Sequence, residues 1–253
     1  MIEIIKLKKW FTGSRVIHED ITLNLPTGKM TVIIGQSGEG KSLLLKQIIG
    51  LIKPSSGQIL INKINITQAK QSERDAILKK CGYVFQFAAL LDSLDIFQNI
   101  GITLLEAGKT PVEALPLVKQ VIKSVNLPEH VLDKYPSELS GGMLKRAGLA
   151  RTLLTNPEII FYDEPTSGLD PITTRIIHEL MASLQQQYNL TSVVISHDLD
   201  IFNYADYVAL IANGRVQFFG EAKTIWQSDN PYIYQFIRGL TTGPLKNDSS
   251  QTA

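Results

Sequence analysis

One stretch of the chain has the residue types and the spacing that bind phosphate. It follows an apolar run at 30–34 and reads, in order, Gly35, Gln36, Ser37, Gly38, Glu39, Gly40, Lys41 and Ser42. A loop of the form G-x-x-x-x-G-K-S between a strand and a helix brings backbone N–H groups close to phosphate oxygens. The helix expected from Leu43 onward adds unpaired N–H donors and the positive end of its dipole. We therefore expect a nucleoside-triphosphate site here.

Two side chains of this loop add chemistry of their own. Lys41 can reach the β- and γ-phosphates, and the Ser42 hydroxyl can ligate Mg²⁺. The alternative is a glycine-rich turn that only connects a strand to a helix. A chance match to all four defined positions is rare at ordinary glycine content, so the phosphate site is the stronger interpretation.

Polar side chains also follow two further apolar runs. Gln86 comes directly after 82–85, and Asp163 and Glu164 close the run that begins at 159. In open α/β sheets ligands bind at the carboxyl ends of the strands. There Asp163 can hold Mg²⁺, Glu164 can polarise an attacking water, and Gln86 can ligate Mg²⁺ or orient water. Solvated loop residues are the alternative for all three.

A second glycine-rich helix entry follows at Ser140, Gly141 and Gly142. Ser140 suits a helix N-cap, and the two glycines leave first-turn N–H groups uncovered. The purely structural interpretation is a capped helix start. The other interpretation is a second anion-binding site. The chain then has one triphosphate loop but two glycine-rich helix starts, which suggests that one of them binds the nucleotide of a neighbouring chain.

Three other side chains are candidates on weaker grounds. His197 follows the predicted strand 192–195 and could reach a γ-phosphate or an attacking water. Trp10 and Phe11 end a predicted strand, where they could stack on a base or fill a core. The remaining histidines have no such context, and we expect them to be incidental: His18, His130 and His178.

Hydrophobic patterning predicts an α/β fold with a buried parallel sheet. The predicted strands are 2–10, 16–25, 30–34, 58–61, 82–85, 159–162, 192–195 and a hairpin at 207–220 that turns at Asn213 and Gly214. The predicted helices are 43–51, 68–80, an α-rich insertion at 94–132 punctuated by Pro111, Pro116 and Pro128, and 172–188. We also expect a turn at 12–14 and a disordered tail at 247–253.

Composition limits the partners and the cellular compartment that we expect for this chain. The 253 residues include 25 Lys and Arg against 24 Asp and Glu, a net charge of +1 that creates no general field for nucleic acid. The single cysteine, Cys81, cannot form an internal disulfide, which favours a reducing compartment. No secretory leader or run of about 18 apolar residues is evident, so a cytoplasmic chain is expected.

Six stretches, in order, resemble the motifs of ATP-binding cassette (ABC) transporter ATPases. They correspond to the Walker A loop, Q-loop, signature, Walker B, D-loop and H-loop, and they are 35–42, Gln86, 139–143, 159–164, 167–170 and His197. The resemblance implies an ATPase that uses ATP and Mg²⁺, with Leu43 and Asp170 added to the nucleotide-binding set. It also implies a head-to-tail homodimer in which each ATP lies between one chain's Walker A loop and the other chain's signature.

The family fold that follows from this resemblance is a P-loop NTPase with a RecA-like parallel-sheet core, an antiparallel β subdomain and an inserted α-helical subdomain. We expect the β subdomain and Walker A core at 1–90, the helical subdomain at 91–155, the Walker B and H-loop core at 156–222 and a C-terminal extension at 223–253. Three positions differ from the commonest motifs, although none removes a catalytic group: Glu39, Met143 and Gly168.

Details of the Q-loop, the signature and the stretch at 235–244 are similar to the phospholipid-transport branch (Mla-like) of the family. That branch implies an integral membrane permease, an MCE-type lipid-binding protein, room for a small accessory subunit, and a peripheral place on the cytoplasmic side of the inner membrane. The alternatives are an ATPase of an amino-acid or methionine importer, a non-transport ABC regulator, and a nucleotide-binding module without hydrolysis.

Overall fold

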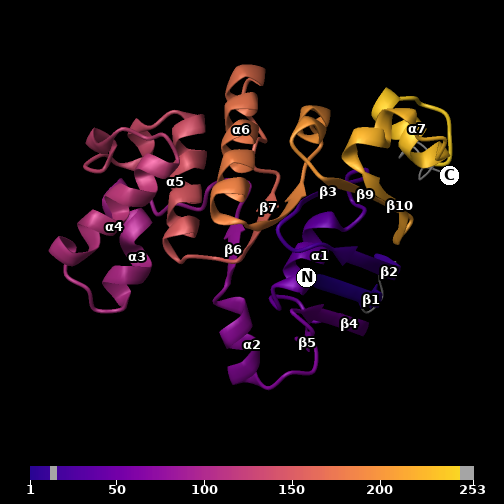
Figure 1. Ribbon diagram of the computed structural model, residues 1–253, viewed down its shortest axis with the longest axis horizontal. Helices are drawn as coiled ribbons and strands as arrows, with labels where there is room; N and C mark the ends of the chain where they lie inside the picture. Colours follow the sequence, from indigo (N-terminus) through magenta and orange to yellow (C-terminus); the bar gives the residue numbers. More distant parts are fainter. Residues whose placement is uncertain (12–15, 246–253) are drawn as a thin grey trace. The chain divides into compact units, whose positions relative to one another are not determined.

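The computed structural model describes residues 1–11 and 16–245 (Figure 1). The chain divides into two compact units, of which one joins Met1–Arg74 to Val193–Ala253 and the other is Asp75–Ser192. The chain therefore begins in the first unit, leaves it after Arg74 and returns to it at Val193.

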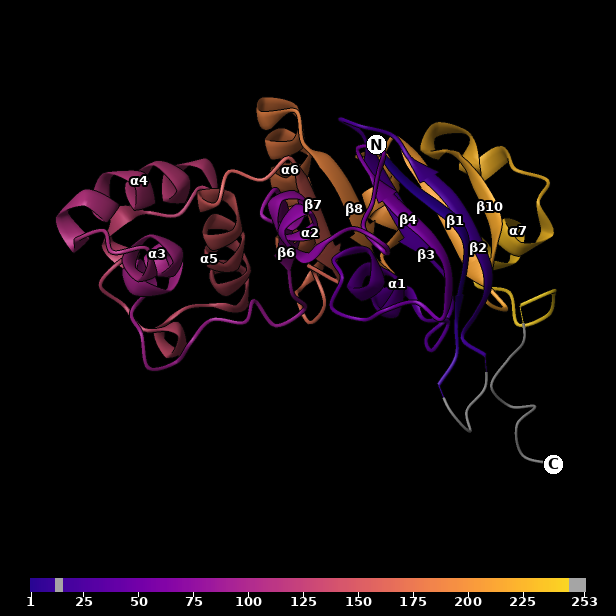
Figure 2. The same cartoon turned by 90° about the horizontal axis from the view of Figure 1, so that it is seen from below.

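An antiparallel layer forms part of the first unit. β1 (Ile2–Lys9) pairs with β2 (His18–Leu25) on one side and with β4 (Ser56–Ile61) on the other, and β4 also pairs with β5 (Ile64–Asn65). Figure 2 shows β1, β2 and β4 running side by side. Apolar and polar residues alternate along β1 and β2, which places one face of each strand in the core. The turn expected at 12–14 lies outside the described residues.

The other strands of this unit include parallel pairs. β3 (Met30–Ile34) is buried along its whole length and runs parallel to β9 (Tyr207–Ala212). β9 turns back into β10 (Arg215–Glu221) through Asn213 and Gly214, whose φ angles are 53° and 68°. Two left-handed residues are what a two-residue hairpin loop needs, so the predicted hairpin is confirmed. The strand order within this unit is β5-β4-β1-β2-β10-β9-β3.

Helical segments complete the first unit. α1 (Lys41–Ile48) follows β3, and two short 3-10 helices, η3 (Leu199–Asn203) and η4 (Ala222–Gln227), flank the β9–β10 hairpin in the sequence. α1 starts two residues before the predicted position and buries Leu44 and Leu45 completely. Its start is therefore part of the glycine loop itself.

One helix of the first unit, α7 (Pro231–Arg238), has no counterpart among the predicted elements, and it lies beside β10 (Figure 2). Its end signals are nevertheless present in the sequence. Asn230 caps its start through the N–H groups of the first turn, a proline occupies the first helical position, and Gly239 ends it with a φ of 61°. The disordered tail expected at 247–253 lies outside the described residues.

The second unit contains a short parallel pair, β6 (Cys81–Val84) with β7 (Ile159–Asp163). β7 is buried over its first four residues, so the predicted buried parallel strand is confirmed. α6 (Pro171–Tyr188) follows β7. The unit boundaries fall within α2 (Gln71–Leu78) and β8 (Thr191–Ile195).

A group of helices lies between β6 and β7 in the sequence of the second unit. They are α3 (Ile96–Glu106), α4 (Pro111–Ser124), α5 (Gly141–Leu154) and the 3-10 helices η1 (Glu129–Val131) and η2 (Pro136–Glu138). α3, α4 and α5 all contact one another (Figure 1). Among the described residues of the whole chain, every helix is too short or too polar to be a membrane span.

Local signals explain where α3 and α4 begin. Each starts with a capping box, formed by Asp95 with Gln98 and by Thr110 with Glu113. The expectation that Pro116 interrupts the helical pattern is wrong, because Pro116 lies inside α4. A proline there removes one backbone bond near the helix start, where the adjacent turn is exposed and water can replace the lost donor.

Candidate functional site

The predicted phosphate loop is a tight turn between β3 and α1. Gly40 has a φ of 83°, a left-handed conformation that favours glycine. At Gly35 a Cβ atom would lie 2.3 Å from the carbonyl oxygen of Ile211, so no larger residue fits beside β9. The glycines therefore let the backbone reverse direction close to its neighbours and start a helix at once.

Lys41 closes this loop on itself. Its side chain is 5% exposed, and its ammonium donates to the carbonyl oxygens of Gly35 and Gln36, both at 2.8 Å. Gly40 is the N-cap of α1 and has no side chain that could cap the N–H groups of the first turn. A buried cation beside such a helix start is suited to an anionic ligand.

A buried histidine supports the loop from behind. His18, the first residue of β2, is fully buried, and its Nε2 lies 3.2 Å from the carbonyl oxygen of Gly40. The Gln47 amide nitrogen lies 3.0 Å from the other ring nitrogen, Nδ1. Burial lowers the pKa of His18, which favours the neutral ring. From the sequence we expect no role for His18, and the structure places it in contact with the phosphate loop, a contact that no motif in the sequence reveals.

Trp10 and Phe11 follow β1, which ends at Lys9, and both side chains are exposed. They are 45% and 44% exposed, so neither fills the core. The Lys9 ammonium lies 4.6 Å from the centre of the Phe11 ring. The stacking interpretation therefore remains for both rings, and the core alternative is excluded.

In the second unit, a tyrosine holds the first of the paired carboxylates. The Tyr83 hydroxyl donates to Asp163 at 2.8 Å, and its ring lies 4.5 Å from that of Phe85, centre to centre. Burial and the nearby Asp163 carboxylate raise the pKa of Tyr83, so the hydroxyl remains a donor. Glu164 follows with a φ of 49°, a conformation that non-glycine residues rarely adopt and that is often found at functional sites.

Gln86 connects the second carboxylate, Glu164, to the D-loop. Its amide nitrogen donates to the Ser167 hydroxyl at 3.1 Å and lies 3.4 Å from a Glu164 carboxylate oxygen. Three residues that the sequence assigns to separate motifs therefore meet inside one unit. Gln86 is placed to respond to any rearrangement at Glu164.

The segment after Gln86 is strained and is held by α5. Ala88 and Ala89 have φ angles of 58° and 50°, and left-handed backbone costs an L-residue about 1–2 kcal/mol. The Arg151 guanidinium donates to the carbonyls of Ala88 at 2.9 Å and Ala89 at 2.7 Å, and Lys145 donates to the Gln86 carbonyl. Sequence reasoning missed both basic residues, whose only sequence signal is their place on the helix that follows the signature.

The second glycine-rich entry is the start of α5. Ser140 accepts a bond from the Met143 N–H at 3.4 Å, which confirms it as the N-cap. A Cβ at Gly142 would lie 2.5 Å from the Thr173 methyl group, so this glycine also allows α6 to approach. Asp170 caps α6 and accepts from Thr173 through both hydroxyl and N–H, and these bonds hold the pKa of its carboxyl below the usual value.

The candidate residues divide between the two units. The loop 35–42, Trp10, Phe11 and the exposed His197 after β8 belong to the first unit. The second contains Gln86, Ser140, Gly141, Gly142, Asp163, Glu164 and Asp170. In the part of the chain that the structure describes, no three His, Cys, Asp or Glu side chains gather into a group that could hold a metal ion by themselves.

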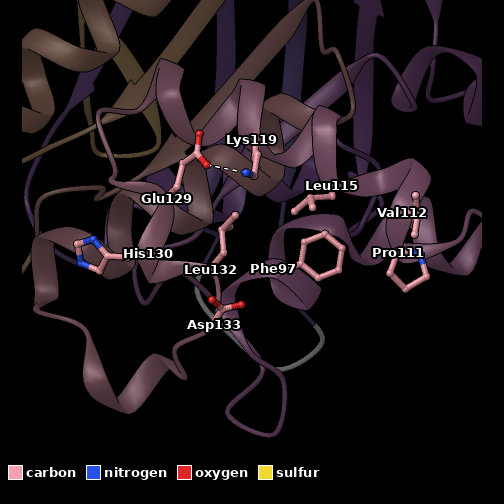
Figure 3. A pocket seen from close by; sticks show the side chains of 9 residues that line it. All are labelled: Phe97, Pro111, Val112, Leu115, Lys119, Glu129, His130, Leu132 and Asp133. Carbon is pink, nitrogen blue, oxygen red and sulfur yellow. Dashed lines mark ion pairs between the residues drawn. The ribbon is translucent and has the colours of Figure 1, made fainter.

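A separate apolar pocket of about 530 Å³ lies within the second unit (Figure 3). Phe97 of α3, Val112 and Leu115 of α4 line it, and a Lys119–Glu129 ion pair of 2.7 Å crosses its rim. Val112 is 81% exposed, so the pocket presents apolar surface to solvent. None of the sequence motifs includes these residues.

Comparison with known proteins gives a consistent family. The family model described as "ABC transporter" matches residues 18–167. The chain is 36% identical, over 92% of its length and 89% of the relative, to the "Intermembrane phospholipid transport system ATP-binding protein MlaF" of Haemophilus influenzae. It is 37% identical to the "Probable ribonucleotide transport ATP-binding protein mkl" of Mycobacterium leprae, over 96% of this chain and 70% of that one.

Solved structures agree on the fold. An ATP-binding cassette solved as a dimer in a post-hydrolysis state with ADP and phosphate matches with a TM-score of 0.79 and 28% identity, covering 88% of this chain and 99% of that one. A cassette from Clostridium perfringens that is part of the transporter complex cbiONQ matches with a TM-score of 0.82 and 28% identity, covering 90% and 91%. The predicted α/β ABC ATPase fold is therefore confirmed.

The Tyr83 hydroxyl provides a test of the second unit's local geometry. Tyr83→Phe keeps the ring against Phe85 but removes the donor to Asp163, and we expect the free energy of unfolding to fall by about 1–2 kcal/mol. Urea denaturation measures the change. Tyr135→Phe is the control, since Tyr135 is exposed and its loss should change stability by less than about 0.5 kcal/mol. Equal stability of the two variants would show that the hydrogen bond to Asp163 does not contribute to the free energy of unfolding.

Proposed function

Since the chain belongs to the ABC transporter family and is an ATPase of that family, we propose that it powers phospholipid transport through a separate membrane permease. The ATP-binding part of the proposal rests on the loop at 35–42, where buried Lys41 and the N-terminus of α1 suit a triphosphate. The phospholipid part rests on the relatives named MlaF, which align over nine-tenths of the chain.

Each catalytic role is proposed for a residue of one sequence motif. Lys41 holds the phosphates, Glu164 polarises the attacking water and His197 contacts the γ-phosphate. Gly35–Leu43 surround the phosphates, and Trp10 or Phe11 stacks on the base.

Mg²⁺ is proposed as the metal that accompanies ATP. Ser42, Gln86 and Asp163 would supply its protein ligands, and hydroxyl, amide and carboxylate oxygens are the donors that this ion prefers. Because the Gln86 nitrogen donates to Ser167, its amide oxygen is the atom suited to a cation. Such a metal would supply positive charge that neutralises the charge developing on the phosphates during hydrolysis.

We propose that two copies assemble head to tail. In this arrangement Ser140, Gly141, Gly142 and Asp170 of one copy act on the ATP held by the other. A solved relative of 28% identity is a dimer, which supports an assembly of two copies. ATP binding is then coupled to closure of the dimer, because the contacts between ATP and the second copy exist only in the closed state.

Glu164→Gln tests both the catalytic role and the dimer. The amide cannot act as a base, so we expect ATP binding to persist, turnover to fall about 10²–10⁴-fold and ATP-dependent dimers to accumulate. Size-exclusion chromatography and phosphate release measure these effects, with Lys41→Ala as the variant that should neither bind ATP nor dimerise. Wild-type turnover by Glu164→Gln would refute the assigned role.

Cross-linking provides a second readout of the same dimer. Burial raises the pKa of the Cys81 thiol to about 12, so little of the native thiol is ionised at pH 8. Ser37→Cys and Ser140→Cys can therefore be introduced without removing it. An inter-subunit disulfide is expected only with ATP, and its absence in an ATP-loaded Glu164→Gln background would contradict the head-to-tail arrangement.

The permease is proposed to dock on the segment from Gln86 to Ile100 and the adjoining apolar pocket. Fully buried Asn99 joins this segment to α3, since it accepts from the Leu91 N–H at 2.7 Å and donates to the Leu91 and Leu94 carbonyls, each at 2.9 Å. Phe97 in the pocket lies two residues from Asn99. A partner docked at Phe97 would therefore lie close to the hydrogen bonds that hold the backbone at Leu91 and Leu94, within the segment that begins at Gln86.

Val112→Glu tests the docking surface. A charge in this apolar pocket should lower co-purification of the permease at least about tenfold, because docking would bury an unpaired carboxylate. ATP affinity of the isolated chain should not change. Leu51→Glu, which alters another exposed apolar residue in the first unit, is the matched control. Normal permease recovery with Val112→Glu would place the docking surface elsewhere.

An MCE-type lipid-binding protein and a small accessory subunit are the further proposed partners, with the ATPase peripheral on the cytoplasmic face of the inner membrane. Purification of the whole complex from native membranes, followed by lipid extraction, tests the transported substrate. We expect phospholipid bound to a co-purifying MCE-type protein. A small-solute-binding protein in its place would favour an amino-acid or methionine importer, and bound ribonucleotide would favour the activity named for the mycobacterial relatives.

A further inference from the structure

A buried polar pair connects the phosphate loop to the strand behind it. His18 of β2 and Gln47 of α1 are 0% and 1% exposed, although both carry polar side chains. Buried polar groups are costly unless they are hydrogen-bonded, so the pair calls for a specific reason. None of the sequence motifs includes either residue.

The contacts determine which ring nitrogen of His18 carries the proton. The Gln47 amide nitrogen donates to the Leu43 carbonyl at 3.3 Å and lies 3.0 Å from His18 Nδ1. A nitrogen that donates to a carbonyl is the NH₂ group, so Nδ1 must be the acceptor. The proton of the neutral ring is then on Nε2, which donates to the Gly40 carbonyl at 3.2 Å.

That carbonyl belongs to the peptide unit whose N–H is contributed by Lys41. The same oxygen also accepts from the Leu44 N–H at 2.9 Å, so it has two donors. Hydrogen bonds to a carbonyl polarise the amide and strengthen its N–H as a donor, by roughly 10–30% per bond. The loop is also close to the ring, because a Cβ at Gly40 would lie 2.6 Å from His18 Nε2.

We propose that His18 is a positioning residue for nucleotide binding. Its Nε2–H orients and polarises the Gly40–Lys41 peptide, whose N–H belongs to the phosphate-binding first turn of α1, and Gln47 maintains the required tautomer. The inference rests on the proposed role of the loop at 35–42 in binding ATP. It does not depend on the transported substrate or on the permease.

Four variants of the full chain separate positioning from packing. His18→Leu removes the donor, and His18→Gln keeps an N–H donor at a similar distance from the backbone. Gln47→Leu removes the group that sets the tautomer. The double variant His18→Leu/Gln47→Leu removes both polar groups, so that no buried partner remains unpaired. The dissociation constant for ATP, KM, kcat and Tm are measured for each.

We expect His18→Leu to weaken ATP binding about fivefold to tenfold and to lower Tm. The double variant should recover much of the Tm but keep the weakened ATP binding. His18→Gln should bind ATP within about twofold of the wild type, and the changes should appear in KM rather than in kcat. His178→Leu is the control: this histidine is equally buried, on α6, and its loss should lower Tm without altering ATP affinity.

Recovery of both Tm and ATP affinity in the double variant would overturn the inference, since His18 would then serve packing alone. Loss of kcat with an unchanged KM would overturn it as well. Lys41→Ala distinguishes this failure from failure of the proposed function. If the wild type binds ATP and Lys41→Ala does not, the loop has its proposed role whatever the His18 variants show.

Discussion

The structure depends on a backbone constraint at Gly40. The chain leaves the fully buried strand β3, must reverse within a few residues, and must begin α1 at a residue that has no capping side chain. A left-handed glycine makes that geometry accessible, and the Lys41 ammonium holds it by binding two carbonyls of the same loop. His18 holds the third carbonyl from behind. An anion site of this kind is a property of the backbone, and the side chains around it serve mainly to keep that backbone in place.

The second unit follows a comparable principle with different parts. Its central feature is a strained segment, in which two alanines adopt left-handed conformations after Gln86. Arg151 and Lys145 of α5 bind the carbonyls of this segment, and Asn99 binds the backbone just beyond it. Local strain of this kind persists only when several contacts hold it. The segment from Gln86 to α3 is thereby connected both to Glu164 and to the helix that begins at Ser140.

Many of the elements could be predicted because their signals are local. The buried strand β3, the hairpin at Asn213 and Gly214 and the cap at Ser140 follow from hydrophobic patterning, turn chemistry and capping. The interpretation of Pro116 as a break failed, because a proline near an exposed helix start costs less than one in a buried interior. The helix at Pro231–Arg238 was missed although Asn230 and Gly239 mark its two ends, since its apolar face spans only two turns.

The sequence alone determined the order and chemical type of the candidate residues, because a phosphate loop, a carboxylate pair and a capped glycine entry are defined by residue type and short spacing. Only the tertiary structure decided which groups hold them. His18 meets Gly40 across 22 positions, Arg151 meets Ala88 across 63, and Tyr83 meets Asp163 across 80. Such contacts arise where strands and helices distant in the sequence come together, and neither periodicity nor motif spacing encodes them. The physical reason is that a side chain finds its hydrogen-bond partner in space, whereas a motif records only its neighbours along the chain.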